Sequence, residues 1–236
     1  IARNIRTVDA LGFTQIREVE TTNLARRSAK RKDTVDGIVD GRVLHPIEPN
    51  YQNIITQILD DHPSRAFQLY FRFALETGAR SQTISTIRVH HIKEILKEKT
   101  VLGDKLRLDV GNGSSIDSKF STEISTYIPK QLCLDLIEFT ESITWKKSAK
   151  KSNYGLTDNN YIFLTRNGTP YYTSKQEIYE LENSENGLDQ NIAVGGTLKS
   201  QLKMLIEMIK VKHPDFPIFS LHDLRATFAL NSLKNC

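Results

Sequence analysis

The sequence predicts an α+β fold that is mostly α, with a small antiparallel sheet. Two observations carry this prediction. Between residues 44 and 236, most apolar residues recur at helical spacing, and Pro or Gly stands at the end of several such runs. Near residue 105 the period changes to two, which is typical of a half-buried strand. The sequence has no internal repeats.

The helices are expected in order along this part of the chain. Apolar residues at helical spacing predict helices within residues 48–62, 64–77, 82–92, 130–143 and 197–213. Gly78 is expected to cap the second of these at its C-terminus, and Thr197 the last at its N-terminus. A final helix is expected directly after Ser220, its N-cap, because Ser220 and Asp223 form an S-x-x-D capping pattern.

The strands are expected between the third and fourth of these helices. Leu106, Leu108 and Val110 alternate with charged neighbours, and residues 123–129 carry a second alternating run. The two runs predict a β-hairpin with a long polar connection. Residues 161–165 read as a further short strand, and residues 145–160 as a basic, polar loop.

Residues 1–43 lack a long clean period and are expected to be a basic segment or linker that precedes a domain over 44–236. They hold nine Lys/Arg and six Asp/Glu, a net of +3 out of +4 for the whole chain. The run 25–32 supplies five of these cations: Arg26, Arg27, Lys30, Arg31 and Lys32. Such a run fits either a solvated linker or an arm that lies along a phosphate backbone.

Composition excludes several classes of protein. No apolar run approaches the length of a membrane span, and no signal peptide is visible. Cys133 and Cys236 are the only cysteines, which argues against a disulfide scaffold and favours a reducing, cytoplasmic setting. The chain begins with Ile, so we expect a fragment of a longer protein.

The stretch "FSLHDLRATFAL" (219–230) places His222 and Arg225 three residues apart at a predicted helix start. The N–H groups of a first turn already carry partial positive charge, so a cation there indicates a bound anion, and a phosphate fits best. Alone, the pair fits a surface histidine and a solvated arginine equally well. A second arginine, Arg80, follows the Gly78 corner, where it fits either a phosphate contact or a cap on the preceding helix.

Together, "TGARSQTISTIRVHHI" (77–92) and "HDLRATFAL" (222–230) resemble the two motif boxes of the tyrosine recombinases, the phage-type integrase family. The order and spacing of the boxes and the elements between them also agree, so the resemblance covers residue 44 to the end. It implies a helical catalytic domain with a three-stranded antiparallel sheet. It also implies a site-specific DNA recombinase that breaks and rejoins DNA through a 3′-phosphotyrosyl intermediate.

The resemblance also implies roles for single residues. Arg80 and Arg225 would hold the non-bridging oxygens of the phosphate, and His222 would bind it or assist proton transfer. Lys119 would be the acid toward the leaving oxygen, with Lys105 as the fallback. The chemistry needs no metal and no cofactor. The partner would be double-stranded DNA, bound by the basic arm, Lys146 and Lys147, with a tetramer on DNA in the intact protein and possible monomers of this fragment.

Three features depart from that family. Thr83 stands where an acid usually buttresses the first arginine, and Ala226 where a second histidine is frequent. The eight tyrosines all precede the second box, so none is nominated as the nucleophile. We expect the attacking tyrosine beyond this chain, so the fragment alone would hold the phosphate without cutting it.

Other functions remain open at this point. Thr83 and Ala226 also fit a DNA-binding regulator or structural relative that has lost catalysis. A type IB topoisomerase would use the same chemistry. A metal-dependent nuclease is disfavoured, because "LDDHP" (59–63) and "VHHI" (89–92) lack the spacing of a convergent metal cage.

Overall fold

The computed structural model describes residues 2–8, 14–20, 38–39, 43–101, 103–111, 113–183 and 192–234. The chain divides into two units, residues 1–36 and 37–236. The first unit contains an antiparallel hairpin of β1 (Ala2–Val8) and β2 (Thr14–Glu20). The five cations predicted to form a basic arm, Arg26, Arg27, Lys30, Arg31 and Lys32, lie outside the described residues.

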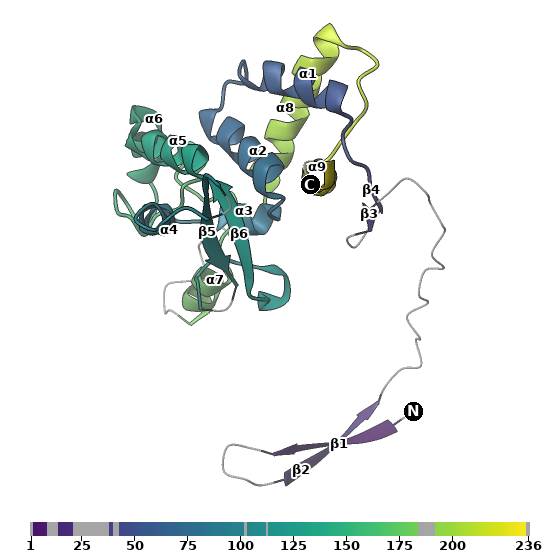
Figure 1. The fold of residues 1–236 in the computed structure, drawn as a ribbon. Helices are drawn as coiled ribbons and strands as arrows, with labels where there is room; N and C mark the ends of the chain where they lie inside the picture. The colour runs from purple at the N-terminus through teal and green to yellow at the C-terminus, as the bar shows by residue number, and fades with distance from the viewer. Residues whose placement is uncertain are drawn as a thin grey trace. The chain divides into compact units, whose positions relative to one another are not determined.

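The second unit is mostly helical (Figure 1). It opens with the short paired strands β3 (Ile38–Val39) and β4 (Val43–Leu44). Its helices are α1 (Pro49–Leu59), α2 (Arg65–Thr77), α3 (Ser81–Ser85), α4 (Val89–Ile95), α5 (Lys130–Glu141), α6 (Ile143–Ala149), α7 (Lys175–Glu182), α8 (Gly196–Lys212) and α9 (Asp223–Lys234). The α+β, mostly α fold class is therefore confirmed. No described helix is both long and apolar enough to span a bilayer.

Helix α2 is the centre of this unit, with α5, β6 and α9 packed against it (Figure 1). Phe67, Tyr70, Phe71 and Phe73 are each at most 1% exposed, so the helix is buried around most of its circumference. Each fully buried phenylalanine contributes roughly 1.5–3 kcal/mol to folding. The side chain of Ser64 caps its N-terminus by accepting from the backbone N–H of Phe67.

Gly78 ends α2 in the left-handed conformation, with φ of 64°, as the sequence predicts. Its N–H donates to the carbonyl of Ala74. Helix α3 begins three residues later, and Arg80 is its N-cap residue, with an extended backbone. The corner between α2 and α3 therefore consists of only three residues, which fixes where Arg80 leaves the chain.

The predicted hairpin is confirmed. Strand β5 (Lys105–Val110) pairs antiparallel with β6 (Ile124–Pro129), with Lys105 opposite Pro129 and Val110 opposite Ile124. Leu106, Leu108 and Val110 are buried, so the alternation seen in the sequence marks the core face.

Among the described residues, the sheet of β5 and β6 has no third strand. Residues 161–165 make only isolated bridges, between Tyr161 and Arg88 and between Leu164 and Pro170. The chain turns back on itself too soon to extend a ladder, because Thr165 and Thr169 are already bonded across the turn at Gly168. The carbonyl of Ile162 is taken by the indole of Trp145 instead of by a neighbouring strand.

Four local predictions are wrong. The helix predicted within residues 82–92 is divided into α3 and α4, because Arg88 between them is extended and forms a bridge with Tyr161. The start of the predicted loop 145–160 belongs to α6, because Ser142 caps a turn that buries Trp145. Helix α8 begins at Gly196 after a left-handed Gly195, so Thr197 does not cap it. Helix α9 begins at Asp223 and not directly after Ser220, so His222 precedes its first turn. The Asp223 carboxylate nevertheless accepts from the Ser220 N–H, which is the carboxylate half of the expected capping box.

Candidate functional site

The two sequence motifs meet where α2 ends and α9 begins. The Arg225 Nη1 donates to the carbonyl oxygen of Gly78 at 2.6 Å, across 147 positions of sequence. A Cβ on Gly78 would lie 2.4 Å from Cδ1 of Phe228, so the corner and the last helix are in van der Waals contact. We call residues 77–80 and 222–228 the Gly78–Arg225 junction.

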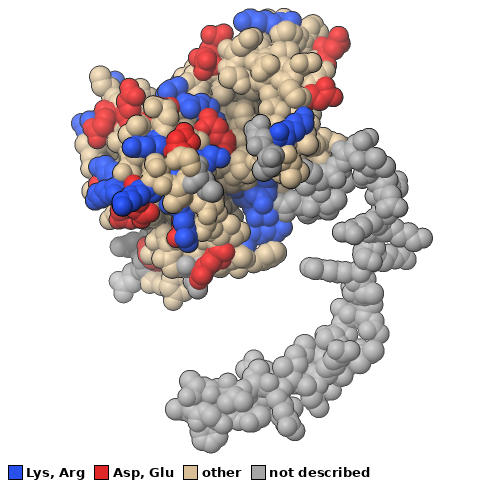
Figure 2. Space-filling model, in the orientation of Figure 1, with Lys and Arg blue, Asp and Glu red and all other residues tan. Residues whose placement is uncertain are grey.

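Arg80 belongs to the same junction. It lies two residues beyond the carbonyl that Arg225 binds, and it is partly buried at the start of α3. The Thr77 side chain stiffens the corner by donating to the Phe73 carbonyl and accepting from the Ala79 N–H. Figure 2 shows Lys and Arg side chains gathered in the area that α3 occupies in Figure 1. The structure thus brings the Arg225 guanidinium to the same rigid corner of the backbone from which Arg80 leaves the chain.

The start of α9 is held from the other side by the chain that enters the unit. The Asp223 carboxylate accepts from the His45 N–H at 3.1 Å, and the Thr227 hydroxyl accepts from the Ile47 N–H at 2.9 Å. His222 is partly exposed just before this helix. These bonds fix the direction in which α9 presents Arg225.

The two departures from the family pattern are both inside the protein. Ala226 is 1% exposed and Thr83 is 6% exposed. A histidine at position 226 would need space that the core fills, and a carboxylate at position 83 would need a buried partner. Packing therefore accounts for the small, uncharged side chains at both positions.

Lys119 is exposed on the long connection between β5 and β6, in a short 3₁₀ turn, η1 (Lys119–Ser121). The connection is tied to α3, because the Gln82 amide donates to the Asp117 carboxylate at 2.7 Å. Lys105 stands at the opposite end of the hairpin, paired with Pro129. At about 3.3 Å per residue, the length of β5 separates it from that connection by roughly 17 Å.

Lys146 and Lys147 lie on α6, and Lys146 pairs with Glu141 at 2.6 Å. Figure 1 places α6 and α9 on different sides of α2, and Figure 2 shows acidic and basic side chains mixed over α5 and α6. The structure therefore does not bring these two lysines together with the Gly78–Arg225 junction.

A second arginine site is one that sequence reasoning missed. Arg88, the N-cap residue of α4, lies with its guanidinium carbon 4.4 Å from the ring centroids of both Tyr154 and Tyr161. It donates to the Asn159 carbonyl at 2.6 Å and lies 3.7 Å from a Glu177 carboxylate oxygen. We call Arg88, His91, Tyr154, Tyr161 and Glu177 the Arg88 centre. A charged residue between the apolar Ile87 and Val89 was the available signal.

Burial governs the ionisation of the Arg88 centre. Burial by itself would lower the pKa of Arg88. The interactions of Arg88 with Tyr161, Tyr154 and Glu177 together have the larger effect, so the pKa of Arg88 is raised. Burial, together with the nearby His90 and Arg88, lowers the pKa of His91 to about 4. His91 Nδ1 accepts from the Arg88 N–H, so Nε2 carries the proton that faces the Ser114 carbonyl. The tyrosine hydroxyl of Tyr161 donates to Glu177 and completes the set.

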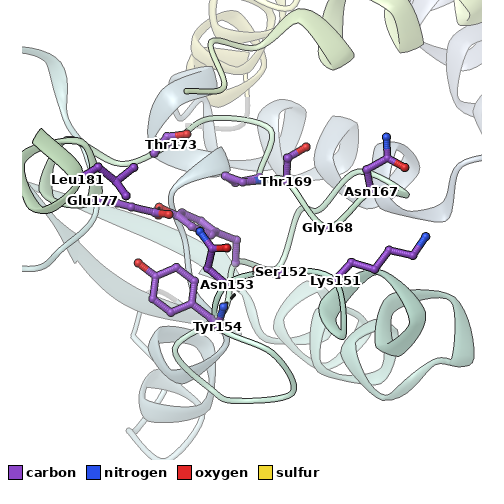
Figure 3. Close-up of a pocket in the computed structure, with 12 residues that line it drawn as sticks. Lys151, Ser152, Asn153, Tyr154, Asn167, Gly168, Thr169, Thr173, Glu177 and Leu181 are labelled. Carbon is purple, nitrogen blue, oxygen red and sulfur yellow. Dashed lines mark hydrogen bonds between the residues drawn. The ribbon is translucent and has the colours of Figure 1, made fainter. Parts of the chain in front are cut away.

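A polar cavity of about 250 Å³ opens beside the Arg88 centre. Figure 3 shows Glu177 and Leu181 of α7 on one side of it and Lys151 and Asn167 on the other. Gly168 is required in its wall, because a Cβ there would lie 2.6 Å from the backbone of Lys151 and Ser152. Arg80, Lys119, His222 and Arg225 are not among its lining residues.

No group of three or more His, Cys, Asp and Glu side chains in the described ranges is placed to hold a metal ion. Comparison of the chain with protein-family models, with curated proteins and with solved structures finds no significant match.

Proposed function

We propose that this protein is a metal-independent site-specific DNA recombinase that holds the scissile phosphate of double-stranded DNA between Arg80 and Arg225. The observation that carries the proposal is the hydrogen bond from Arg225 to the carbonyl of Gly78. It unites two motifs that the sequence separates by more than half of the chain. Two planar guanidinium groups that leave one rigid corner can each present paired N–H donors to phosphate oxygens.

The chemistry assigned to this corner is a transesterification. A tyrosine hydroxyl gives up its proton to a base, the role open to His222, and its oxygen attacks phosphorus. The bond from phosphorus to the 5′ oxygen breaks, and the 3′-phosphate becomes bonded to the tyrosine. Arg80 and Arg225 stabilise the added charge on the non-bridging oxygens, with His222 at the start of α9 beside them. Lys119 gives a proton to the leaving 5′ oxygen. None of the chain's tyrosines is nominated as the nucleophile, and Tyr70, Tyr161 and Tyr171 are at most 3% exposed.

The intact protein would act as a tetramer on duplex DNA, whereas the 236 residues alone would be monomeric. The basic arm, Lys146 and Lys147 would contribute backbone contacts, so binding would weaken steeply with salt. The cysteine that the structure describes, Cys133, is a buried thiol whose pKa burial raises to about 12, which suits a reducing, cytoplasmic setting.

The test is covalent capture of DNA by the full-length gene product. Binding sites are selected from a random duplex library, and a nick is then placed next to each position so that the released strand diffuses away. We expect an adduct that resists SDS and forms equally well in EDTA. Arg80→Ala and Arg225→Ala should each slow adduct formation at least 100-fold, because each removes a group that stabilises charge in the transition state.

The matched control is Arg72→Gln. Arg72 is an α2 arginine paired with Asp135 at 2.7 Å and takes no part in the proposed site, so its adduct yield should stay unchanged. Adduct formation that needs a divalent metal, or that survives loss of both arginines, would contradict the proposal.

A second candidate is a DNA-binding regulator without catalysis, because Thr83 and Ala226 depart from the pattern of the catalytic family. It predicts salt-dependent binding to the selected duplexes with no adduct on any nicked site.

A further inference from the structure

The connection between β5 and β6 is anchored by one buried carboxylate. Asp117 is 8% exposed, and its oxygens accept from the Gln82 amide of α3 at 2.7 Å and from the Lys175 N–H of α7 at 3.1 and 3.2 Å. Its own N–H donates to the Thr86 hydroxyl at 3.0 Å. The loop is therefore fastened to two helices, one of which, α3, begins directly after Arg80.

The turn that follows Asp117 is closed by further bonds. The Ser118 hydroxyl donates to the Thr122 carbonyl at 2.6 Å, and the Lys175 ammonium donates to the Ser118 carbonyl at 3.4 Å. Residues 119–121 are thus held on a built support, although their side chains are exposed.

This turn also holds an aromatic residue in a backbone conformation that bulky side chains avoid. Phe120 has φ of 58°, and Ser121 follows with φ of 55°. Within the described ranges, the non-glycine residues with positive φ are these two and Ser115, all in the same connection. A bulky residue with positive φ is uncommon and strained, and it persists where the surroundings enforce it, frequently at functional sites.

The Phe120 ring is the most exposed large apolar side chain that the structure describes, at 85%. It lies 5.4 Å from the Lys119 ammonium, measured to the ring centroid. Exposure of an apolar ring and its strained backbone are both unfavourable in the protein alone. A ring and a cation side by side suit a partner that has both an anionic backbone and flat apolar faces. Duplex DNA has both, because base steps stack within reach of phosphates.

We propose that Phe120 is an apolar wedge that enters the DNA groove beside the phosphate held at the Gly78–Arg225 junction and unstacks one base step. This inference rests on the proposed function. The Lys119 ammonium would lie near the sugar–phosphate backbone, and the Phe120 ring would pack against the bases. Asp117 positions both by tying their loop to α3, the helix that Arg80 precedes. Unstacking a step bends the duplex and makes that position of the site sensitive to sequence.

The experiment uses the full-length gene product and a selected duplex with a single 2-aminopurine at successive positions. The wild type is expected to raise the fluorescence at one base step, since the probe brightens when it unstacks. Phe120→Ala should abolish that rise and weaken binding by about 10-fold, in line with the worth of an aromatic–base stack. Phe120→Trp should restore both. The slope of affinity against salt should be unchanged, because no phosphate contact is removed.

Val211→Ala is the matched control, because Val211 is 83% exposed on α8 and no role is assigned to it. It should behave as the wild type. A Phe120→Ala protein that keeps the fluorescence rise and binds within twofold of the wild type would overturn the wedge, while covalent capture by Arg80 and Arg225 would still stand. A wild type that shows no salt-dependent DNA binding would overturn the proposed function and the wedge together. A Phe120→Ala protein with normal DNA behaviour and a lost protein partner would assign the ring to protein docking instead.

Discussion

Arg88 and Arg225 both lie at the starts of helices, yet their surroundings differ. Arg88 is 7% exposed, lies over two tyrosine rings and is paired with Glu177. Arg225 is partly exposed and donates to the carbonyl of a glycine corner. A guanidinium surrounded by its own protein's rings and acceptors holds a core together. We propose that one that stands at a surface corner beside a second arginine binds a phosphate. The two arginines thus differ in their surroundings and not only in their motifs.

The largest effect is expected when the Arg88 centre loses its cation. Arg88→Ala leaves the Glu177 carboxylate buried without its charged partner, which costs about 3–5 kcal/mol of unfolding free energy. Urea denaturation followed by circular dichroism would measure it. Arg88→Lys should recover little, because an ammonium cannot stack and fork as a guanidinium does. A loss below about 1 kcal/mol would show that Arg88 does not support the core.

The next effect is a loss of stability at mildly acidic pH, from the same centre. Burial holds the pKa of His91 near 4, below its ordinary value of 6.5, so the folded state keeps the ring neutral. The unfolded chain gains a proton below pH 6.5. The contribution of His91 to the free energy of unfolding is therefore fully present above pH 6.5. It falls by about 1.4 kcal/mol per pH unit between pH 6.5 and about pH 4.

Denaturant midpoints between pH 7 and 4 would measure this decline. The pKa of His62 is also lowered, mainly by burial, so it contributes in the same direction. His91→Gln should flatten the decline without removing it. An unaltered pH profile in that variant would assign the dependence to other groups.

A smaller effect is expected at the Gly78–Arg225 junction from Gly78→Ala. The left-handed backbone and the 2.4 Å approach to Phe228 should together cost about 2–3 kcal/mol of unfolding free energy. In a Phe228→Ala background only the backbone cost remains, about 1 kcal/mol. Additive losses in this double-mutant cycle would mean that the corner and α9 do not pack as described.

The smallest change in stability is expected from Arg225→Ala. It removes one charged hydrogen bond at a partly exposed position, worth about 1–2 kcal/mol. Its effect on covalent DNA capture should nonetheless be the largest of the four. If Arg225→Ala destabilised the protein as much as Arg88→Ala, the contrast between the two arginines would disappear and the junction would be structural.

The sequence by itself determined the local elements. Helical spacing identified α2 and α8, and the period of two identified β5 and β6. The glycine at position 78 predicted the left-handed C-cap of α2. These follow from interactions within a few residues, where spacing and backbone preference decide. It also supplied the two motifs, but as separate segments.

Tertiary structure decided what those segments do to one another. Only the packing of α9 on α2 brings Arg225 to the Gly78 carbonyl. Arg88 is buried because Tyr154, Tyr161 and Glu177, which are distant in sequence, pack around it. The predicted third strand, residues 161–165, is absent for the same reason. A short apolar run forms a strand only if the edge of another strand is available, and here the Trp145 indole binds the Ile162 carbonyl. Asp117 and the exposed Phe120 carry no sequence signal, because their roles depend on contacts with α3 and α7. Such contacts depend on how distant segments pack, which spacing along the chain does not encode.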